Sequence, residues 1–302
     1  MHIVTAGSEF LDIDAYAGCV AYAELLQLTG EPARAVSTAP LNESITQSLR
    51  ALDAPLECAY SSHEDDVFTL IDVSIPEFLD PIVDKSRVVA VIDHHTGYET
   101  FWQERIGSRA QIEFIGAACT LVYERWQRLQ KLDEMSRVSA RLLIAGILDN
   151  TLNLQASVTT DRDRLAYASL LSNTGLTETW ARDYFSECQQ AIEADLPAAI
   201  INDTKTILNI TNLPRAFGQL VVWDGQTILK NRESEIATVM SQKDADWGLN
   251  LVSIGERTSY FVSDNPVTQE KLGGLLGFDM SSGVAKTDKL WLRKEVLKAA
   301  KV

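Results

Sequence analysis

The stretch that decides the fold reads VVAVIDHH, at residues 88–95. Its first five residues are apolar and mostly β-branched, which predicts a buried strand, and Asp93, His94 and His95 follow that strand at once. Similar apolar runs come earlier in the chain and alternate with helical patterns. The expected strands are residues 2–5, 33–37 and 67–73, and the expected helices are residues 14–28 and about 42–52. Strands that alternate with helices predict an α/β fold whose sheet is doubly wound and mainly parallel.

After residue 116 the pattern becomes helical and then returns to α/β. Four helices are expected, at residues 117–130, 136–148, 162–173 and 177–192. Strands are expected at residues 217–223, 248–254 and 258–263, with a helix at residues 233–242 between the first two. The change of pattern predicts a larger N-terminal domain over residues 1–190 and a smaller α/β C-terminal domain over residues 191–302.

Charge and composition exclude several classes of protein. The 302 residues include 42 acidic and 27 basic side chains, a formal charge of −15, and such a field repels nucleic acid and anionic membranes. The four cysteines form no CxxC pair, and no apolar run reaches the roughly 20 residues that span a bilayer. Because residues 1–14 show no leader pattern, we expect a reduced, cytoplasmic protein with Cys19 and Cys119 in its core.

Acidic side chains stand where the expected strands of the N-terminal domain end. Asp12 and Asp14 lie in the turn after the first strand, and Asp72 follows the apolar run that begins at residue 67. Asp149, beside Asn150, directly follows a second apolar run at residues 142–148. Ligands bind at the carboxyl ends of parallel strands, so these carboxylates should converge with the DHH triplet at residues 93–95. Carboxylates with imidazole favour Mn²⁺, Zn²⁺ or Fe²⁺ over Ca²⁺, and two such metals sharing a ligand can activate a water.

Structural roles compete with metal binding for single residues. Taken alone, Asp12, Asp14 or Asp72 is better explained as a helix N-cap or turn residue. The adjacent pair of histidines behind a strand is harder to explain in that way. His2 and His63 have no such context and are expected at the surface or terminus.

In order and spacing, these residues resemble the motifs of the DHH phosphoesterase family. GSEFLDID at residues 7–14 resembles the first motif, DVS at 72–74 the second, and DHH at 93–95 the motif that names the family. GAACT at residues 116–120 and LDNT at 148–151 resemble the two that follow, so the match covers residues 1–160. The C-terminal part is similar to the branch with manganese-dependent pyrophosphatases, exopolyphosphatases and prune-like proteins, through DTK at 203–205 and RK at 293–294.

The resemblance implies roles for the matching residues. It implies two divalent metal ions, Mn²⁺ foremost with Mg²⁺ or Co²⁺ as alternatives, and Asp72 bridging them; the implied ligands are Asp12, Asp14, Asp72, His94 and Asp149. It also implies that Asp93 orients a histidine and that His95 contacts the substrate. The implied phosphate clamp, on a DHH-associated domain that closes over the site, is Lys205, Arg293 and Lys294. Ser8 departs from the His or Asn of relatives and is a weaker ligand.

The function implied is hydrolysis of phosphoanhydride bonds in pyrophosphate or short polyphosphate by a metal-activated water. The expected partner is a small phosphate substrate, and a homodimer through the N-terminal domain stays open. One alternative is a nucleotide or cyclic-dinucleotide phosphodiesterase, which is disfavoured because GGLLG at residues 273–277 has no histidine nearby. Another is a non-catalytic relative that binds phosphate or protein, which Ser8 keeps open.

Overall fold

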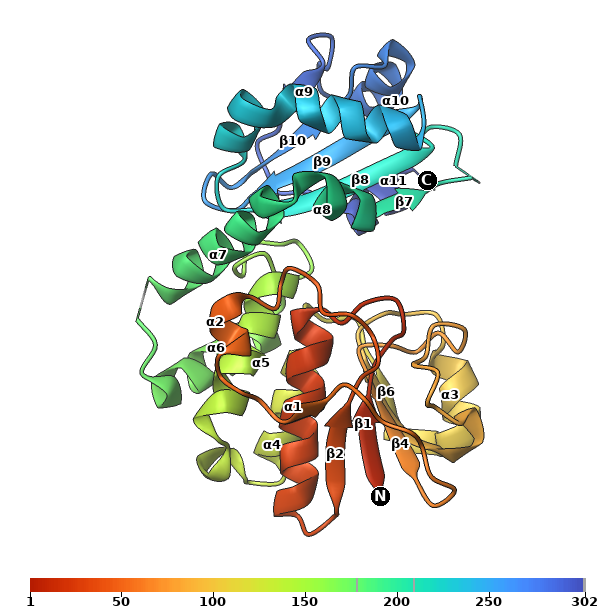
Figure 1. Cartoon of the computed structure of the whole chain (residues 1–302), viewed down its shortest axis with the longest axis vertical. Coiled ribbons are helices and arrows are strands. Elements are labelled where there is room, and N and C mark those ends of the chain that lie inside the picture. Colours follow the sequence, from red (N-terminus) through yellow and green to blue (C-terminus); the bar gives the residue numbers. More distant parts are fainter. Residues whose placement is uncertain (178, 209, 301–302) are drawn as a thin grey trace. The chain divides into compact units, whose positions relative to one another are not determined.

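The structure is a computed structural model that describes residues 1–177, 179–208 and 210–300 (Figure 1). The chain divides into two compact units, Met1–Ala181 and Arg182–Val302. The division falls within helix α7, Trp180–Ala194. Residue 178, inside the helix expected at 177–192, lies outside the described residues. Across the described chain, no helix is both long and apolar enough to cross a bilayer.

The first unit is built on a sheet of six parallel strands in the order β3-β2-β1-β4-β5-β6. This order reverses direction between β1 and β4, which is the topology of a doubly wound sheet. The α/β fold predicted from the alternating pattern is therefore confirmed. Two short strands, β3 and β6, have no clear sequence signal. The strands are β1 His2–Thr5, β2 Ala33–Val36, β3 Leu56–Glu57, β4 Val67–Ile71, β5 Val88–Asp93 and β6 Ala110–Ile112.

Helices cover both faces of this sheet. Figure 1 shows α1, α4 and α5 on one side of the strands and α3 on the other. Trp102 of α3 packs with Ile3, Phe68 and Leu70, whose side chains alternate along β1 and β4 with those on the opposite face. The helices are α1 Ile13–Leu28, α2 Gln47–Arg50, α3 Glu99–Ile106, α4 Ala118–Arg128, α5 Arg137–Asn150 and α6 Asp161–Thr174, with 3₁₀ turns at Lys85–Arg87, Gly107–Arg109 and Leu132–Glu134.

The helix expected at about residues 42–52 is shorter than predicted. Only Gln47–Arg50 is α-helical. The carboxamide of Asn42 accepts hydrogen bonds from the backbone N–H and the hydroxyl of Ser44, at 3.0 and 2.5 Å, which favours a turn there. Thr46 then caps the short helix by accepting from the N–H of Leu49.

The second unit is a five-stranded mixed sheet in the order β11-β10-β9-β8-β7, in which only β8 and β9 are parallel. Alternate residues of β8 and β10 enter two separate cores, one shared with α8 and α9 and the other with α10 and α11. Helix α9 begins eight residues before the predicted position 233, because Asp224 caps it. The elements are β7 Thr204–Thr206, β8 Ala216–Val222, β9 Trp247–Ser253, β10 Thr258–Val262 and β11 Val284–Lys286, with α8 Leu196–Asn202, α9 Gly225–Lys243, α10 Pro266–Leu276 and α11 Arg293–Ala299.

The GGLLG segment at residues 273–277 has a structural role. Gly273 and Gly274 lie in the last turns of α10, and Gly277 caps that helix at a φ of 77°. A left-handed φ at the helix end favours glycine, so these residues end a helix.

Candidate metal centre

The sheet order brings the functional segments of the first unit together. Strands β1, β4 and β5 are neighbours, so the segments that follow their carboxyl ends share one edge of the sheet. Asp72 follows β4 directly, and His94 and His95 follow β5. One potential ligand atom from each of these three residues lies within 4.8 Å of those of the other two. This grouping is the centre of the candidate site.

The ring of His94 points a lone pair at carboxylates. Its Nδ1 lies 3.1 Å from the carbonyl oxygen of Ile115, so Nδ1 carries the proton and donates. In the neutral ring, Nε2 is then an acceptor, and it lies 3.2 Å from Oδ1 of Asp72 and 3.8 Å from Oδ2 of Asp14. Nε2 is buried and, among the described residues, has no hydrogen-bond partner. Acceptors that face one another in a buried space fit a cation between them.

Asp14 is completely buried at the start of two helices. It lies in the first turn of α1, and its Oδ2 and Oδ1 accept from the N–H groups of Ala118 and Cys119 at the N-terminus of α4, each at 2.8 Å. Burial, together with the neighbouring carboxylate of Asp72, raises its pKa to about 7. A nearby cation would favour the ionised form instead, as a metal ligand requires.

Asp93 and His95 form a hydrogen-bonded pair. Oδ1 of Asp93 accepts from the N–H groups of His94 and His95, at 2.7 and 3.0 Å, and lies 2.9 Å from Nδ1 of His95. Burial alone would lower the pKa of His95, but the hydrogen bond to Asp93 and the charge of Asp72 raise it. Nδ1 therefore donates to Asp93 and does not serve as a metal ligand, although it lies 3.5 Å from Asp72. The side chain is 57% exposed, which leaves Nε2 available to a ligand.

The backbone of Asp72 is unusual. Its φ of 59° is in the left-handed region, which Asp tolerates better than most residues. Its N–H donates to the carbonyl of Ile92 in β5, at 2.9 Å. This conformation turns the chain out of β4 and holds the Asp72 carboxylate against the His94 ring. Strained residues of this kind are concentrated at functional sites.

Three other sequence candidates come from segments at the ends of β1 and α5. Asp12 is the N-cap of α1, and its Oδ1 accepts from the N–H of Ala15 at 3.0 Å, so the helix-cap role holds for that oxygen. Ser8 follows β1 and donates its N–H to the carbonyl of Phe78 at 2.9 Å. Asp149 lies in the last turn of α5, three residues after Gly146, which packs against Asp14. That spacing puts Asp149 on the helix face that carries Gly146.

A methyl group at residue 146 is expected to disturb the site. The Cβ of Gly146→Ala would lie 2.5 Å from Sγ of Cys119 and 3.2 Å from Cα and Oδ1 of Asp14. We expect a loss of about 2 kcal/mol in the free energy of unfolding, and weaker metal binding, because overpacking shifts Asp14. Urea unfolding and Mn²⁺ titration measure the two effects.

The matched control for that substitution is Gly274→Ala in helix α10. A Cβ there meets nothing within 4 Å, and residue 274 is exposed. We expect this variant to gain about 0.5–1 kcal/mol, since alanine is the better helix former. Equal stability changes in the two variants would contradict the packing argument.

Asp163, which belongs to none of the sequence motifs, holds the turn of small residues in place. This buried carboxylate accepts from the N–H of Gly116 at 3.2 Å, from the hydroxyl of Thr120 at 2.6 Å, and from both the N–H and the hydroxyl of Thr160 at 2.7 Å. It thereby joins the start of α6 to the segment that precedes α4, whose N-terminus binds Asp14. The only sequence signal was the capping-box spacing from Thr160 to Asp163.

His2, expected at the surface or terminus, is the first residue of β1 and has two side-chain partners. Its side chain is 12% exposed. Nε2 lies 2.7 Å from the hydroxyl of Thr69, and Nδ1 lies 3.2 Å from Oε2 of Glu31. Pairing of β1 with β4 brings Thr69 to this ring, which sequence spacing does not reveal. His63 is exposed, as expected.

The basic candidates of the second unit gather around β7 and α11. Arg293, the first residue of α11, donates from Nη2 to Oδ1 of Asp203 at 2.6 Å and from Nη1 to the carbonyl of Asp203 at 2.5 Å. Its side chain is 12% exposed, so Asp203 sets the direction of the guanidinium. Lys205, two residues after Asp203 on β7, is exposed, as is Lys294.

Comparisons with known proteins agree with this geometry. Residues 2–147 match the model of the DHH family, N-terminal domain, which confirms the resemblance found in the sequence. A probable manganese-dependent inorganic pyrophosphatase of Listeria welshimeri is 26% identical over 273 residues, 88% of this chain and 83% of that protein. A protein of the same name from Lactobacillus johnsonii is 27% identical over 172 residues, 56% of this chain and 54% of that protein.

Solved structures share the fold. A putative family II inorganic pyrophosphatase of Methanococcus jannaschii matches with a TM-score of 0.72 and 17% identity over 100% of both chains. An exopolyphosphatase-related protein of Bacteroides fragilis matches with a TM-score of 0.54 and 13% identity, over 99% of this chain and 90% of that one. At these identities the likeness is one of fold.

Proposed function

Residues 2–147 are similar to the DHH family, N-terminal domain, and on that premise we propose that this chain hydrolyses the phosphoanhydride bond of inorganic pyrophosphate with the help of Mn²⁺. The observation that carries the proposal is Nε2 of His94, a buried acceptor facing the carboxylates of Asp72 and Asp14. The names of the relatives from Listeria and Lactobacillus support the choice of pyrophosphate and manganese.

The donor set fits a divalent transition metal. One imidazole nitrogen and several carboxylate oxygens suit Mn²⁺, whereas an all-oxygen shell would favour Ca²⁺ or Mg²⁺. We propose that Asp12, Asp14, Asp72, His94 and Asp149 hold two such ions, with Asp72 shared between them. When bound, divalent metals lower the pKa of a coordinated water toward neutrality and polarise a phosphoryl oxygen.

The residues of the chain would bind and orient the substrate. Because Nδ1 of His95 donates its hydrogen bond to Asp93, Nε2 stays available to a phosphate oxygen, and it donates to that oxygen when the ring is protonated. The hydrogen bond and nearby charge that raise the pKa of His95 favour that protonated form near neutral pH. In the second unit, we assign Lys205, Arg293 and Lys294 to the phosphate groups. The bond from Asp203 would pre-orient Arg293 for that task.

Short polyphosphate is the second candidate substrate. Two points support this substrate: the similar solved structure is of an exopolyphosphatase-related protein, and pyrophosphate and polyphosphate contain the same kind of phosphoanhydride bond. Cleavage of a terminal phosphate needs the same metal centre for both substrates. Hydrolysis of pyrophosphate and of polyphosphate therefore differ only in the length of substrate that the site accommodates. Activity on a cyclic dinucleotide would instead need a recognition site for a base.

One assay tests the proposal. The full chain is incubated with Mn²⁺, Mg²⁺ or Co²⁺, and phosphate release is followed from pyrophosphate, tripolyphosphate, long-chain polyphosphate and a cyclic dinucleotide. We expect release from pyrophosphate, fastest with Mn²⁺, and none from the cyclic dinucleotide. If no phosphate is released from any of the four substrates while metal is bound, the proposal of a hydrolase is refuted and a non-catalytic binding protein is favoured.

Ser8 offers a test of the metal centre that does not depend on turnover. The resemblance to the DHH phosphoesterases implies a histidine or asparagine at the position of Ser8, and a hydroxyl is a weak ligand for a divalent metal. Ser8→His is therefore expected to tighten Mn²⁺ binding by roughly tenfold, the lower end of what one added ligand contributes. Isothermal titration calorimetry measures it, and an unchanged affinity would contradict the placement of Ser8 at the metal.

A further inference from the structure

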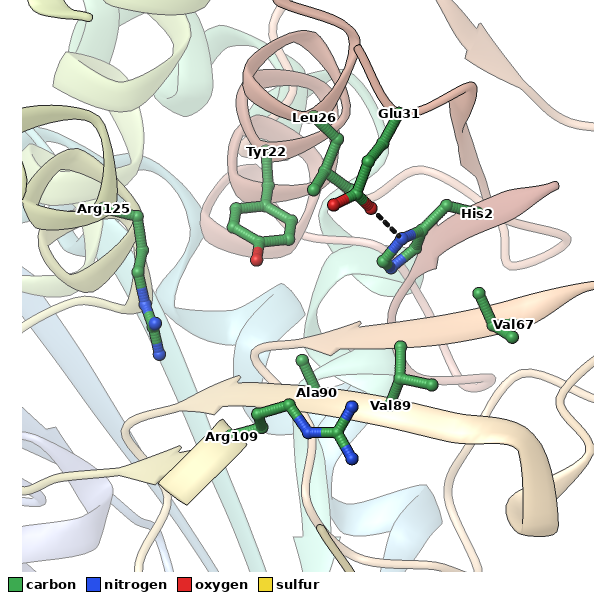
Figure 2. A pocket seen from close by; sticks show the side chains of 9 residues that line it. All are labelled: His2, Tyr22, Leu26, Glu31, Val67, Val89, Ala90, Arg109 and Arg125. Carbon is green, nitrogen blue, oxygen red and sulfur yellow. Dashed lines mark hydrogen bonds and ion pairs between the residues drawn. The ribbon is translucent and has the colours of Figure 1, made fainter. Parts of the chain in front are cut away.

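A cavity of about 360 Å³ lies at the edge of the parallel sheet opposite to the metal centre. It is bordered by the first residues of β1 and β4, His2 and Val67, and by Val89 and Ala90 near the start of β5 (Figure 2). The metal centre lies at the carboxyl ends of these strands, so the two are separate. A volume of this size is at the lower end of what small-molecule sites occupy.

The side chain of Arg125 is the unusual feature of this cavity. It comes from the last turn of α4 and lines the cavity, and its Nε is buried. Within the described part of the chain, no atom accepts a hydrogen bond from that Nε and no carboxylate pairs with the guanidinium. The two acidic side chains whose charges act on Arg125, Glu113 and Glu124, are both bound by Arg162. A partly buried guanidinium that no described carboxylate pairs with is costly, and an anionic ligand in the cavity would balance its charge.

Further polar groups line the same cavity. Figure 2 shows the hydroxyl of Tyr22 and the guanidinium of Arg125 both directed toward the strands, with a second guanidinium, that of Arg109, beyond Ala90. Arg109 donates from Nε to the carbonyl of Ile106 at 3.4 Å, and its side chain is exposed. Glu31 is the one carboxylate among the lining residues, and it lies against His2.

The charge of the cavity is therefore positive. Two guanidinium groups outweigh the single carboxylate of Glu31, and burial lowers the pKa of His2 so that its ring is neutral near pH 7. Burial also raises the pKa of the Tyr22 phenol, which keeps it a neutral donor. In a protein with a formal charge of −15, a recess with an excess of cationic donors is a local exception.

The remaining lining residues are apolar, namely Leu26, Val67, Val89 and Ala90. Guanidinium groups bind phosphate in a bidentate manner, and an apolar wall suits a body without charge. We propose that this cavity, built around Arg125 and Arg109, binds a small phosphate monoester with an apolar or aromatic body, of the size of a nucleoside monophosphate. The site is distinct from the metal centre and from hydrolysis.

The test uses adenosine 5′-monophosphate as the probe, titrated into the full chain in EDTA by isothermal titration calorimetry. We expect one molecule to bind per chain. Arg125→Met should weaken binding at least about tenfold, the usual effect of losing a charged hydrogen bond. Arg109→Gln should weaken it less, because that side chain is exposed. Adenosine and inorganic phosphate, which each carry half of the recognised chemistry, should bind more weakly than the monophosphate.

Two control variants show whether binding depends on this cavity alone. Arg128→Met removes an exposed arginine from the end of the same helix, and Asp72→Asn alters the metal centre; neither should change the affinity. Thermal unfolding without ligand should be unchanged or raised in Arg125→Met, because the buried Nε loses no partner. Absence of binding, an affinity unchanged in Arg125→Met, or an affinity lost in Asp72→Asn would overturn the proposal.

Discussion

Asp72→Asn is expected to lower the rate of phosphate release from pyrophosphate by about a thousandfold or more, equivalent to about 4 kcal/mol of transition-state stabilisation. Oδ1 of Asp72 lies 3.2 Å from Nε2 of His94 and 3.5 Å from Nδ1 of His95, so this carboxylate is at the middle of the centre. An amide keeps its shape but removes the negative charge and supplies N–H groups that repel a cation. Metal affinity should fall together with the rate.

Steady-state phosphate release and Mn²⁺ titration measure the two effects on the same protein. Glu77→Gln is the matched control, because it neutralises an exposed carboxylate in the loop that follows Asp72. We expect that control to retain activity and metal affinity. Normal turnover in Asp72→Asn would refute the role of Asp72 as a shared metal ligand. If Glu77→Gln loses as much activity as Asp72→Asn, the loss comes from the change in net charge and not from the metal centre.

Asp163→Asn is expected to give the largest loss of stability, about 3 kcal/mol in the free energy of unfolding. The carboxylate accepts four hydrogen bonds, from Gly116, Thr120 and twice from Thr160, and it is fully buried. An amide has one oxygen to accept with, and its NH₂ group faces donors. At least one buried donor is then left unsatisfied, and the capping box of α6 opens.

Urea unfolding measures this loss. Asp161→Asn, which removes an exposed carboxylate from the first turn of the same helix, is the control and should cost less than about 1 kcal/mol, the usual size of a helix-dipole effect. Similar losses in both variants would show that the helix dipole, and not the buried network, accounts for the effect. Mn²⁺ affinity should also fall in Asp163→Asn, because the turn before α4 positions the N–H groups that bind Asp14.

The strands that carry the site could be predicted because their signal is local. Buried parallel strands are rich in apolar and β-branched residues, and residues 2–5, 67–71 and 88–92 have that composition. The short strands β3, β6, β7 and β11 have two or three residues each, and their pairing depends on neighbours that are distant in the sequence. The short helix at Gln47–Arg50 was overestimated because a side-chain hydrogen bond from Ser44 to Asn42 competes with helix formation.

Within the candidate site, the residue types could be predicted but their protonation and pairing could not. The motif around residue 93 identified Asp93, His94 and His95 as a unit. Only the fold shows that His94 donates to Ile115 and turns its other nitrogen to Asp72, while His95 binds Asp93. Asp163 and Arg125 were missed for the same reason. Asp163 acts through hydrogen bonds to other elements, and Arg125 is notable because no described carboxylate pairs with it. Neither residue belongs to a motif.

By itself, the sequence determined the alternation of strands and helices, the acidic residues at the strand ends and the family to which the chain is similar. These properties depend on residues that are close in the sequence, through apolar periodicity and the chemistry of short motifs. Only the tertiary structure decided which carboxylate meets which imidazole nitrogen and why Gly146 lacks a side chain. It also decided that, among the described residues, no carboxylate pairs with the guanidinium of Arg125 at the opposite sheet edge. Hydrogen-bond direction and burial depend on contacts between distant segments, and no local pattern records them.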